Sequence, residues 1–242
     1  MIAEEKVGDI AVVSIDRHER RNALDIEHCD ALRHAAGKAA KIGARVLVIT
    51  GRGSSFSAGA DLGGVYNDTF REALYSMLGA ITDLPIPVIA AVNGPAIGAG
   101  TQLAIACDLR VAEPSAVFAV PTARQGLAVD PWTVRRLAVL GGGGTARSLL
   151  IGGERIDAHL ACQRGLVDRV GCLEEALAWA REIAGFAPLS LGYSKHALRS
   201  IFEPVGSDPD LNAAFEKCWQ SEDFAEGRLA RQEKREPRFR GR

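Results

Sequence analysis

Two loops built almost entirely from small residues constrain this chain more than any other feature of its sequence. The first is GRGSSFSAGAD (51–61), and the second is NGPAIGAG (93–100). Each follows an apolar run, RVLVIT (45–50) or PIPVIAAV (85–92), and each leads into a segment predicted to be helical. Glycine and alanine at such a corner let main-chain N–H groups approach a ligand, and the helix start adds positive potential. The chain is therefore predicted to be an α/β protein whose ligand site lies at these two loops.

A glycine-rich loop alone is weak evidence, because tight turns of this kind join strands to helices in many α/β proteins. Neither loop fits the dinucleotide-binding pattern GxGxxG, and neither ends in the Gly-Lys-Ser/Thr of a phosphate-binding loop. Two N–H groups that converge on one oxygen would instead form an oxyanion hole.

The sequences of the two loops together are more specific evidence than either loop alone. SAGAD (57–61), followed by AVNGPAIGAG (91–100) and CDLR (107–110), resembles the crotonase superfamily, also called the enoyl-CoA hydratase/isomerase family. Four further segments are similar to this family, although His18 stands where proline is usual: RHERRNAL (17–24), GLAVDPWTVRRL (126–137), GLVDRV (165–170) and the tail EKREPRFRGR (233–242). The resemblance therefore covers nearly the whole chain.

Composition agrees with one globular α/β protein. The 242 residues are 47% hydrophobic, which suffices for a substantial core. The net charge of −1 shows no nucleic-acid footprint, and charged residues, glycine or proline interrupt every apolar stretch before it reaches the length of a membrane span. The five cysteines and five histidines have no metal-binding spacing, and the N-terminus does not resemble a signal peptide. We therefore expect a cytoplasmic protein without a bound metal.

The pattern along the chain predicts strands interleaved with helices, and then helices alone. Parallel strands need such crossovers. The predicted strands are 10–15, 45–50, 86–92, 108–112, 116–119 and 167–170, and the predicted helices are 26–41, 67–83, 98–106, 131–140, 145–151, 157–164, 173–187, 189–201, 208–221 and 222–233. The run GGGG (141–144) is expected to break the helix that begins after Asp130.

The resemblance sharpens this α/β prediction into a particular architecture. It implies a spiral of ββα repeats over residues 1–172 and a C-terminal helical module over residues 173–242 that mediates trimer formation. We accordingly expect a homotrimer or a dimer of trimers.

The resemblance also implies the ligand. Members of the family bind acyl-CoA thioesters, so coenzyme A would enter as part of the ligand and no separate cofactor is expected. Matching the motifs places the two oxyanion-hole N–H groups at Ala60 and Ala99. The further ligand-binding positions that it implies are Arg20, Arg21, Asn22, Ala23, Leu24, Ala58, Asp61, Leu62, Gly98, Gln102, Thr122 and Trp132, with Phe239 and Arg240 of the tail reaching a neighbouring subunit.

Two residues argue against efficient hydration of an enoyl thioester. Hydratases of the family carry glutamates at the positions that match Gln102 and Thr122. One carboxyl group must take a proton from water and another must serve the α-carbon. An amide cannot accept that proton near neutral pH, and a hydroxyl is too weak an acid or base. We therefore predict weak or no hydratase activity.

Asp130 is the remaining carboxylate at a matching position, where some isomerases and a dehalogenase of the superfamily carry a catalytic aspartate. Because Pro131 follows it, Asp130 also has the signature of a helix N-cap with proline at the first helical position. Its neighbours Val129 and Trp132, with Val65, Tyr66, Phe70 and Leu74, either line an acyl pocket or pack in the core.

Three hypotheses follow for the function. The first is a fatty acyl-CoA binding protein of lipid metabolism that lacks the hydratase glutamates, like a branch of the family found in actinobacteria. The second is an enoyl-CoA double-bond isomerase that uses Asp130. The third is a non-catalytic carrier or scaffold that docks to other lipid-metabolism enzymes.

Overall fold

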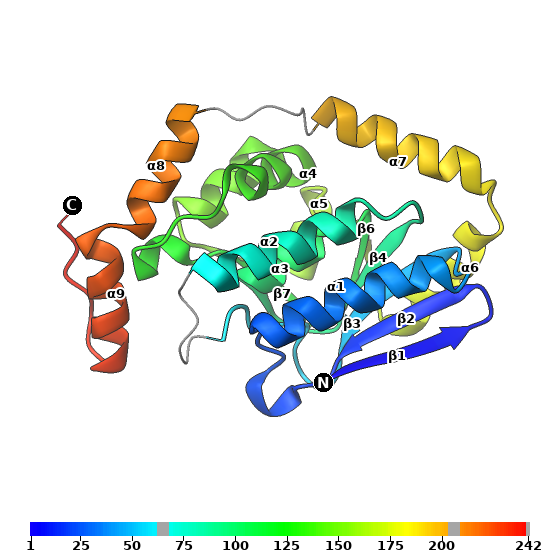
Figure 1. Cartoon of the computed structure of the whole chain (residues 1–242), viewed down its shortest axis with the longest axis horizontal. Coiled ribbons are helices and arrows are strands. Elements are labelled where there is room, and N and C mark those ends of the chain that lie inside the picture. The colour runs from blue at the N-terminus through cyan, green and yellow to red at the C-terminus, as the bar shows by residue number, and fades with distance from the viewer. Residues whose placement is uncertain (62–67, 203–208, 241–242) are drawn as a thin grey trace.

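A computed structural model of the chain describes residues 1–61, 68–202 and 209–240 (Figure 1). Strands and helices alternate in its first two thirds, and helices alone follow. The strands are β1 (Ile2–Val7), β2 (Ile10–Ile15), β3 (Val46–Gly51), β4 (Val88–Val92), β5 (Ala96–Ile97), β6 (Leu109–Ala112), β7 (Val117–Ala119), β8 (Arg155–Asp157) and β9 (Arg169–Val170).

The described strands form two sheets. The larger has six strands in the order β1-β2-β3-β4-β6-β9, and all its pairs are parallel except β1 with β2. The smaller has the order β5-β7-β8. The predicted α/β fold class is confirmed.

Nine helices are seen in the described part of the chain. They are α1 (Ile26–Lys41), α2 (Asp68–Thr82), α3 (Ala99–Ala106), α4 (Pro131–Leu150), α5 (Ala158–Gln163), α6 (Leu173–Ala184), α7 (Pro188–Phe202), α8 (Pro209–Trp219) and α9 (Glu222–Gln232), with short 3-10 turns at His18–Arg20 and Thr122–Gln125. None of the helices in this part of the chain is long and apolar enough to cross a membrane.

Both faces of the large sheet are covered, because alternate residues of a strand point to opposite sides. Leu47 and Ile49 of β3 belong to the main core, together with the apolar faces of α1, α2 and α3. Val46 and Val48 point the other way and pack against α6. The face of α1 predicted from Cys29, Leu32 and Ala36 is buried. Helix α6 was predicted to belong to the C-terminal module, but it packs against the sheet. The boundary between the two modules at residue 172 therefore stays a prediction.

The structure adds details that the pattern did not predict. β1, β5 and β8 were not predicted, and the first of these forms a hairpin with β2 through Gly8 and Asp9. The break predicted at the GGGG segment is confirmed, because Gly142 has the non-helical values φ 77° and ψ 157° and divides α4 into two helical parts there. The sequence directly after SAGAD also predicts a single helical turn; this segment lies outside the described residues, as do Leu62, Val65 and Tyr66.

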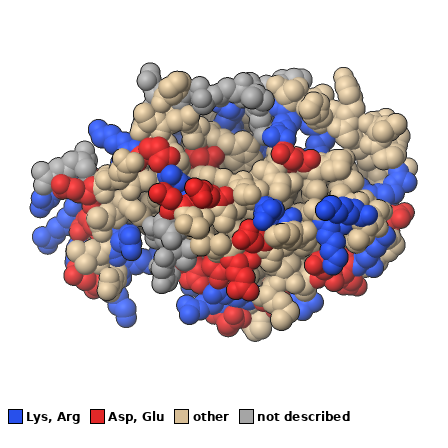
Figure 2. Space-filling model, in the orientation of Figure 1, with Lys and Arg blue, Asp and Glu red and all other residues tan. Residues whose placement is uncertain are grey.

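Figure 2 shows basic and acidic side chains interspersed over one face of the molecule. Figure 1 shows α7, α8 and α9 along the outside of the sheet and its covering helices. This arrangement leaves the two small-residue loops near α2, α3 and the start of α4, where the candidate site lies.

Candidate functional site

The two small-residue loops lie side by side and are held together by main-chain hydrogen bonds. Ser57 and Ala96 form a parallel bridge, and the Ile97 N–H donates to the Ser57 carbonyl oxygen at 2.9 Å. Gly59 has φ 93°, and a Cβ there would lie 2.5 Å from the carbonyl oxygen of Ile97. A side chain at Gly59 is therefore excluded by both backbone conformation and space.

The segment 17–24 lies beside the first loop and is joined to it by main-chain hydrogen bonds. The Leu24 N–H donates to the Gly59 carbonyl oxygen at 2.8 Å, and the Asp61 N–H donates to that of Leu24 at 2.7 Å. Asn22 is fully buried, and its amide donates to the carbonyl oxygens of Arg52 and Ser55. Asn22 therefore fixes the segment 17–24 to the first loop rather than offering its side chain to a ligand.

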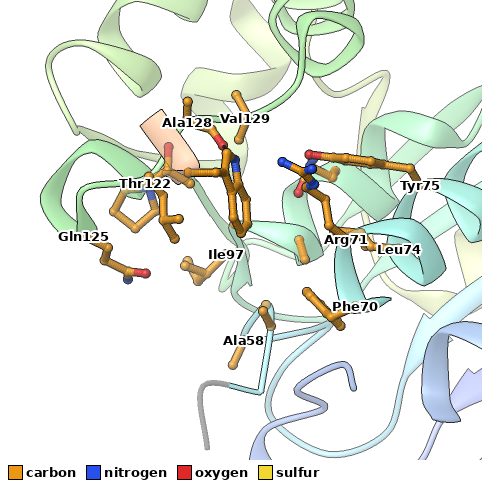
Figure 3. Close-up of a pocket in the computed structure, with 18 residues that line it drawn as sticks. Ala58, Phe70, Arg71, Leu74, Tyr75, Ile97, Thr122, Gln125, Ala128 and Val129 are labelled. Atoms are coloured by element: carbon orange, nitrogen blue, oxygen red, sulfur yellow. Dashed lines mark hydrogen bonds between the residues drawn. The ribbon is translucent and has the colours of Figure 1, made fainter. Parts of the chain in front are cut away.

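A cavity of about 90 Å³ opens between the loops (Figure 3). Its apolar side is formed by Phe70 and Leu74 of α2 and by Ile97, Leu127 and Val129. The rest of the wall comes from residues 58–60, 98–99 and 121–122, with Arg71, Tyr75, Gln102, Gln125, Ala128 and Trp219. The cavity is thus mainly apolar and carries a few polar groups, as is usual for a small-molecule site.

The main-chain N–H groups of Ala60 and Ala99 belong to residues on the wall of this cavity. Neither N–H donates a hydrogen bond to another of the described residues. Ala99 is the first residue of α3, where N–H groups have no partner within the helix. Both groups are therefore available to a ligand oxygen in the cavity.

Gln102 lines the cavity, but its amide group is engaged behind the wall. Its Nε2 donates to the Thr133 hydroxyl at 2.8 Å and lies 3.3 Å from Oδ1 of Asp130. Thr133 in turn donates to Asp130 through its hydroxyl and through its main-chain N–H. Gln102 therefore serves this buried network and cannot exchange a proton with a ligand.

Asp130 is the N-cap of α4, the structural role that its place before Pro131 predicted. Asp130 is not among the residues that line the cavity. Burial raises the pKa of the Asp130 carboxyl above its ordinary value, while the hydrogen bonds from Thr133 act in the opposite direction. The carboxyl is thus held beside the cavity and faces Gln102 and Thr133.

Replacing Asp130 should reveal this raised pKa in the pH dependence of stability. A carboxyl whose folded-state pKa is raised stabilises the fold fully below its unfolded pKa of about 3.9, and this contribution is lost as the pH rises through the folded-state value. The free energy of unfolding of the wild type, relative to Asp130→Asn, should therefore decrease in urea titrations as the pH rises above about 4.

Asparagine caps a helix almost as well as aspartate, so Asp130→Asn isolates the effect of titration. Asp130→Ala removes the cap as well and should cost about 1 kcal/mol. If the free energy of unfolding of the wild type instead increased with pH relative to that of Asp130→Asn, the site would favour the ionised carboxylate.

The other residues predicted for the site lie on the cavity wall, in the core or beside the loops. Ala58, Gly98 and Thr122 line the cavity. Trp132 packs against the core, with the Arg136 guanidinium 5.9 Å from its ring centre. The segment from Arg20 to Leu24 and Asp61 borders the loops, where Asp61 forms an ion pair with Arg17 at 2.8 Å.

The tail residues Phe239 and Arg240 are away from the cavity wall of their own chain. The tail folds back along α9, where the Arg240 N–H donates to the Asp223 carboxylate at 2.6 Å and the Arg238 N–H to Glu226 at 2.7 Å. A contact between Phe239 and a ligand of a neighbouring subunit stays a prediction.

Arg71, Tyr75 and Trp219 also line the cavity, although the sequence did not predict them as site residues. Arg71 and Tyr75 are one helical turn apart and next to the predicted pocket residues Phe70 and Leu74, so helical spacing could have indicated them. Trp219 comes from the end of α8, and its indole N–H donates to the Ala128 carbonyl oxygen at 3.2 Å. No local pattern around residue 219 indicates that contact.

The chain belongs to the enoyl-CoA hydratase/isomerase family, whose profile it matches over residues 5–242. It is 42% identical over 242 residues to the "probable enoyl-CoA hydratase echA6" of Mycobacterium tuberculosis, and the match covers both chains completely. Among solved structures it is similar to carnitinyl-CoA hydratase from Mycobacterium avium (32% identity, TM-score 0.85, 100% of this chain and 98% of that chain). It is also similar to an enoyl-CoA hydratase/isomerase from Pseudoalteromonas atlantica (29% identity, TM-score 0.87, 99% of each chain). The predicted crotonase fold with C-terminal helices is confirmed.

Proposed function

We propose that this protein binds acyl-CoA thioesters of lipid metabolism and hydrates enoyl thioesters weakly or not at all. The observation that carries the proposal is one cavity with two available N–H groups, Ala60 and Ala99, beside a glutamine tied to Asp130. Membership of the family supports a thioester ligand. The glutamine and Thr122 support binding without efficient hydration, because neither is a carboxylic acid.

In this proposal the thioester oxygen accepts hydrogen bonds from Ala60 and Ala99, and the acyl chain lies against Phe70 and Leu74. Donors fixed before the ligand arrives lose little freedom on binding. The same donors would stabilise negative charge on that oxygen, by about 3 kcal/mol for one donor. In this proposal the chain thus has the N–H donors that stabilise negative charge on the thioester oxygen, but it lacks the carboxyl groups that transfer protons.

Two finer assignments belong to the same proposal. The full-length similarity to mycobacterial relatives supports placement in an actinobacterial branch without the catalytic glutamates. All five cysteines are free thiols, which suits the reducing cytoplasm.

An isomerase that uses Asp130 is less well supported. Its carboxylate accepts hydrogen bonds from Thr133 and Gln102, and the residue is absent from the cavity wall. The carboxylate would have to leave these partners to reach the α-carbon of a bound thioester.

Isothermal titration with straight-chain acyl-CoA thioesters from four to sixteen carbons tests the proposal. We expect saturable binding of at least one thioester, with free coenzyme A and the free fatty acid binding more weakly. If no thioester binds more tightly than free coenzyme A, the acyl cavity is not a ligand site.

We also propose that the protein assembles as a trimer or a dimer of trimers. Helix α7 lies along the outer edge of the molecule (Figure 1) and exposes Leu189, Tyr193 and Leu198. Large apolar side chains exposed together on one helix are typical of an interface. Sedimentation velocity at micromolar concentration should give three or six times the mass of one chain, and a monomer would contradict the assembly.

A further inference from the structure

Among the described residues that line the cavity, Arg71 of α2 is a partly buried cation. Its side chain is only 14% exposed. One terminal nitrogen, Nη2, lies 3.0 Å from Glu216 and 3.3 Å from Asp68. The guanidinium carbon lies 5.2 Å and 5.0 Å from the ring centres of Phe215 and Trp219. The Arg71 side chain thus connects α2 to α8 at the cavity.

The other terminal nitrogen of Arg71, Nη1, is buried and has no hydrogen-bond partner in the described part of the chain. An unsatisfied charged donor inside a protein is costly, and such groups in native proteins usually have a function or a missing partner. Because Arg71 lines the cavity, an acceptor on the ligand could satisfy Nη1.

Tyr75 provides a second polar group on the same wall, one turn further along α2. Figure 3 shows the side chains of Arg71 and Tyr75 approaching each other at the cavity. The Tyr75 hydroxyl lies against the main chain of Asp130, and burial raises its pKa far above its ordinary value. Tyr75 therefore remains a neutral hydroxyl that can donate one hydrogen bond.

The surrounding charges decide which acceptor fits. Glu216 and Asp68 face the Arg71 guanidinium, and Asp130 lies beside the Tyr75 hydroxyl. These acidic groups already compensate the positive charge of Arg71, and they would repel a carboxylate on the ligand. A neutral oxygen gains the hydrogen bonds without that repulsion.

We propose that Arg71, assisted by Tyr75, selects acyl-CoA thioesters that carry an oxo or hydroxyl oxygen on the acyl chain beyond the thioester group. The selection rests on the proposed acyl-CoA binding function and narrows it to oxygenated acyl chains. Phe70 and Leu74 contact the hydrocarbon part, and Arg71 Nη1 donates to the added oxygen.

The test compares ligands of one chain length by isothermal titration: hexanoyl-CoA against 3-hydroxy-, 4-oxo- and 5-oxohexanoyl-CoA. A 3-oxo thioester is left out because its enolate would gain at the oxyanion hole independently of Arg71. At least one oxygenated ligand should bind about tenfold or more tightly than hexanoyl-CoA, as expected for a hydrogen bond from a charged donor.

The readout in each variant is the ratio of the two dissociation constants, oxygenated to unsubstituted. Arg71→Met should bring this ratio to about 1, and Arg71→Lys, which keeps the charge but lacks the planar pair of nitrogens, should at least halve the preference. Arg71→Lys decides the test if the methionine variant does not fold. Glu216→Gln is the matched control: it removes the ion-pair partner and leaves Arg71 in place, so the preference should persist.

Equal affinities of the wild type for hexanoyl-CoA and all three oxygenated ligands would overturn the selection by Arg71. A preference that survives Arg71→Met would do the same. Tighter binding of adipyl-CoA, which ends in a carboxylate, than of every neutral ligand would overturn the assignment of a neutral oxygen. If no six-carbon thioester binds while a longer one does, the same comparison with oxygenated chains of that length decides; binding of no thioester at all contradicts the proposed function itself.

Discussion

Crotonyl-CoA should be hydrated by this protein at least about 10³-fold more slowly than the ~10 s⁻¹ typical of enzymes. Losing a general acid–base group costs roughly 10²–10⁴ in rate, and two such groups are absent here, at Gln102 and Thr122. The structure adds a reason at Gln102, because its amide is committed to Asp130 and Thr133. The loss of the enoyl absorbance under saturating substrate measures this rate directly.

The matched control restores both carboxyl groups. Gln102→Glu alone places a second acid where Nε2 now lies 3.3 Å from the Asp130 carboxylate, so the two would share a proton and one pKa would be raised. The double variant Gln102→Glu/Thr122→Glu should hydrate faster than the wild type and than either single variant. A wild-type rate near 10 s⁻¹ would falsify the argument from the missing glutamates.

Three of the strands that the sequence predicted have nearly continuous apolar runs. β2, β3 and β4 are buried on both faces, so their sequences are apolar at nearly every position, with Ser14 and Thr50 as polar exceptions. β1 is an edge strand with the sequence IAEEKV, which has too few apolar residues to stand out. β5 and β8 have two or three residues and carry no periodicity. Their pairing with β7 depends on the tertiary fold and could not be predicted locally.

The site shows the same division between local and tertiary information. The N-cap role of Asp130 and the loop contacts at Ala58, Ala60 and Ala99 follow from residues close in sequence. Trp219 lies about ninety residues beyond Ala128, whose carbonyl oxygen it contacts, so its role emerges only when α8 packs over the cavity. Glycine, alanine and aspartate at turns are thus readable from sequence, whereas the far wall of the cavity is not.

Ala99→Pro should reduce the affinity for acyl-CoA thioesters by at least about tenfold, and the fold should be preserved. Ala99 is the first residue of α3, and proline is favoured at that position because its N–H is not needed by the helix. The substitution removes the proposed donor and places a ring carbon where the N–H points. A lost hydrogen bond to the thioester oxygen and a new steric contact both weaken binding.

Ala99→Gly is the control for this change, because it keeps the N–H and removes only a methyl group. Its acyl-CoA affinity should stay close to that of the wild type in isothermal titration, and both variants should keep the helical circular dichroism of the native protein.

The corresponding proline at Ala60 would be less informative. Gly59 and Asp61 on either side both hydrogen-bond to Leu24, so Ala60→Pro could disturb the loop pairing as well as the donor. Ala99→Pro separates the two effects, since the helix start tolerates proline while the ligand does not. A folded Ala99→Pro protein that binds acyl-CoA as the wild type does would show that the thioester oxygen lies elsewhere in the cavity.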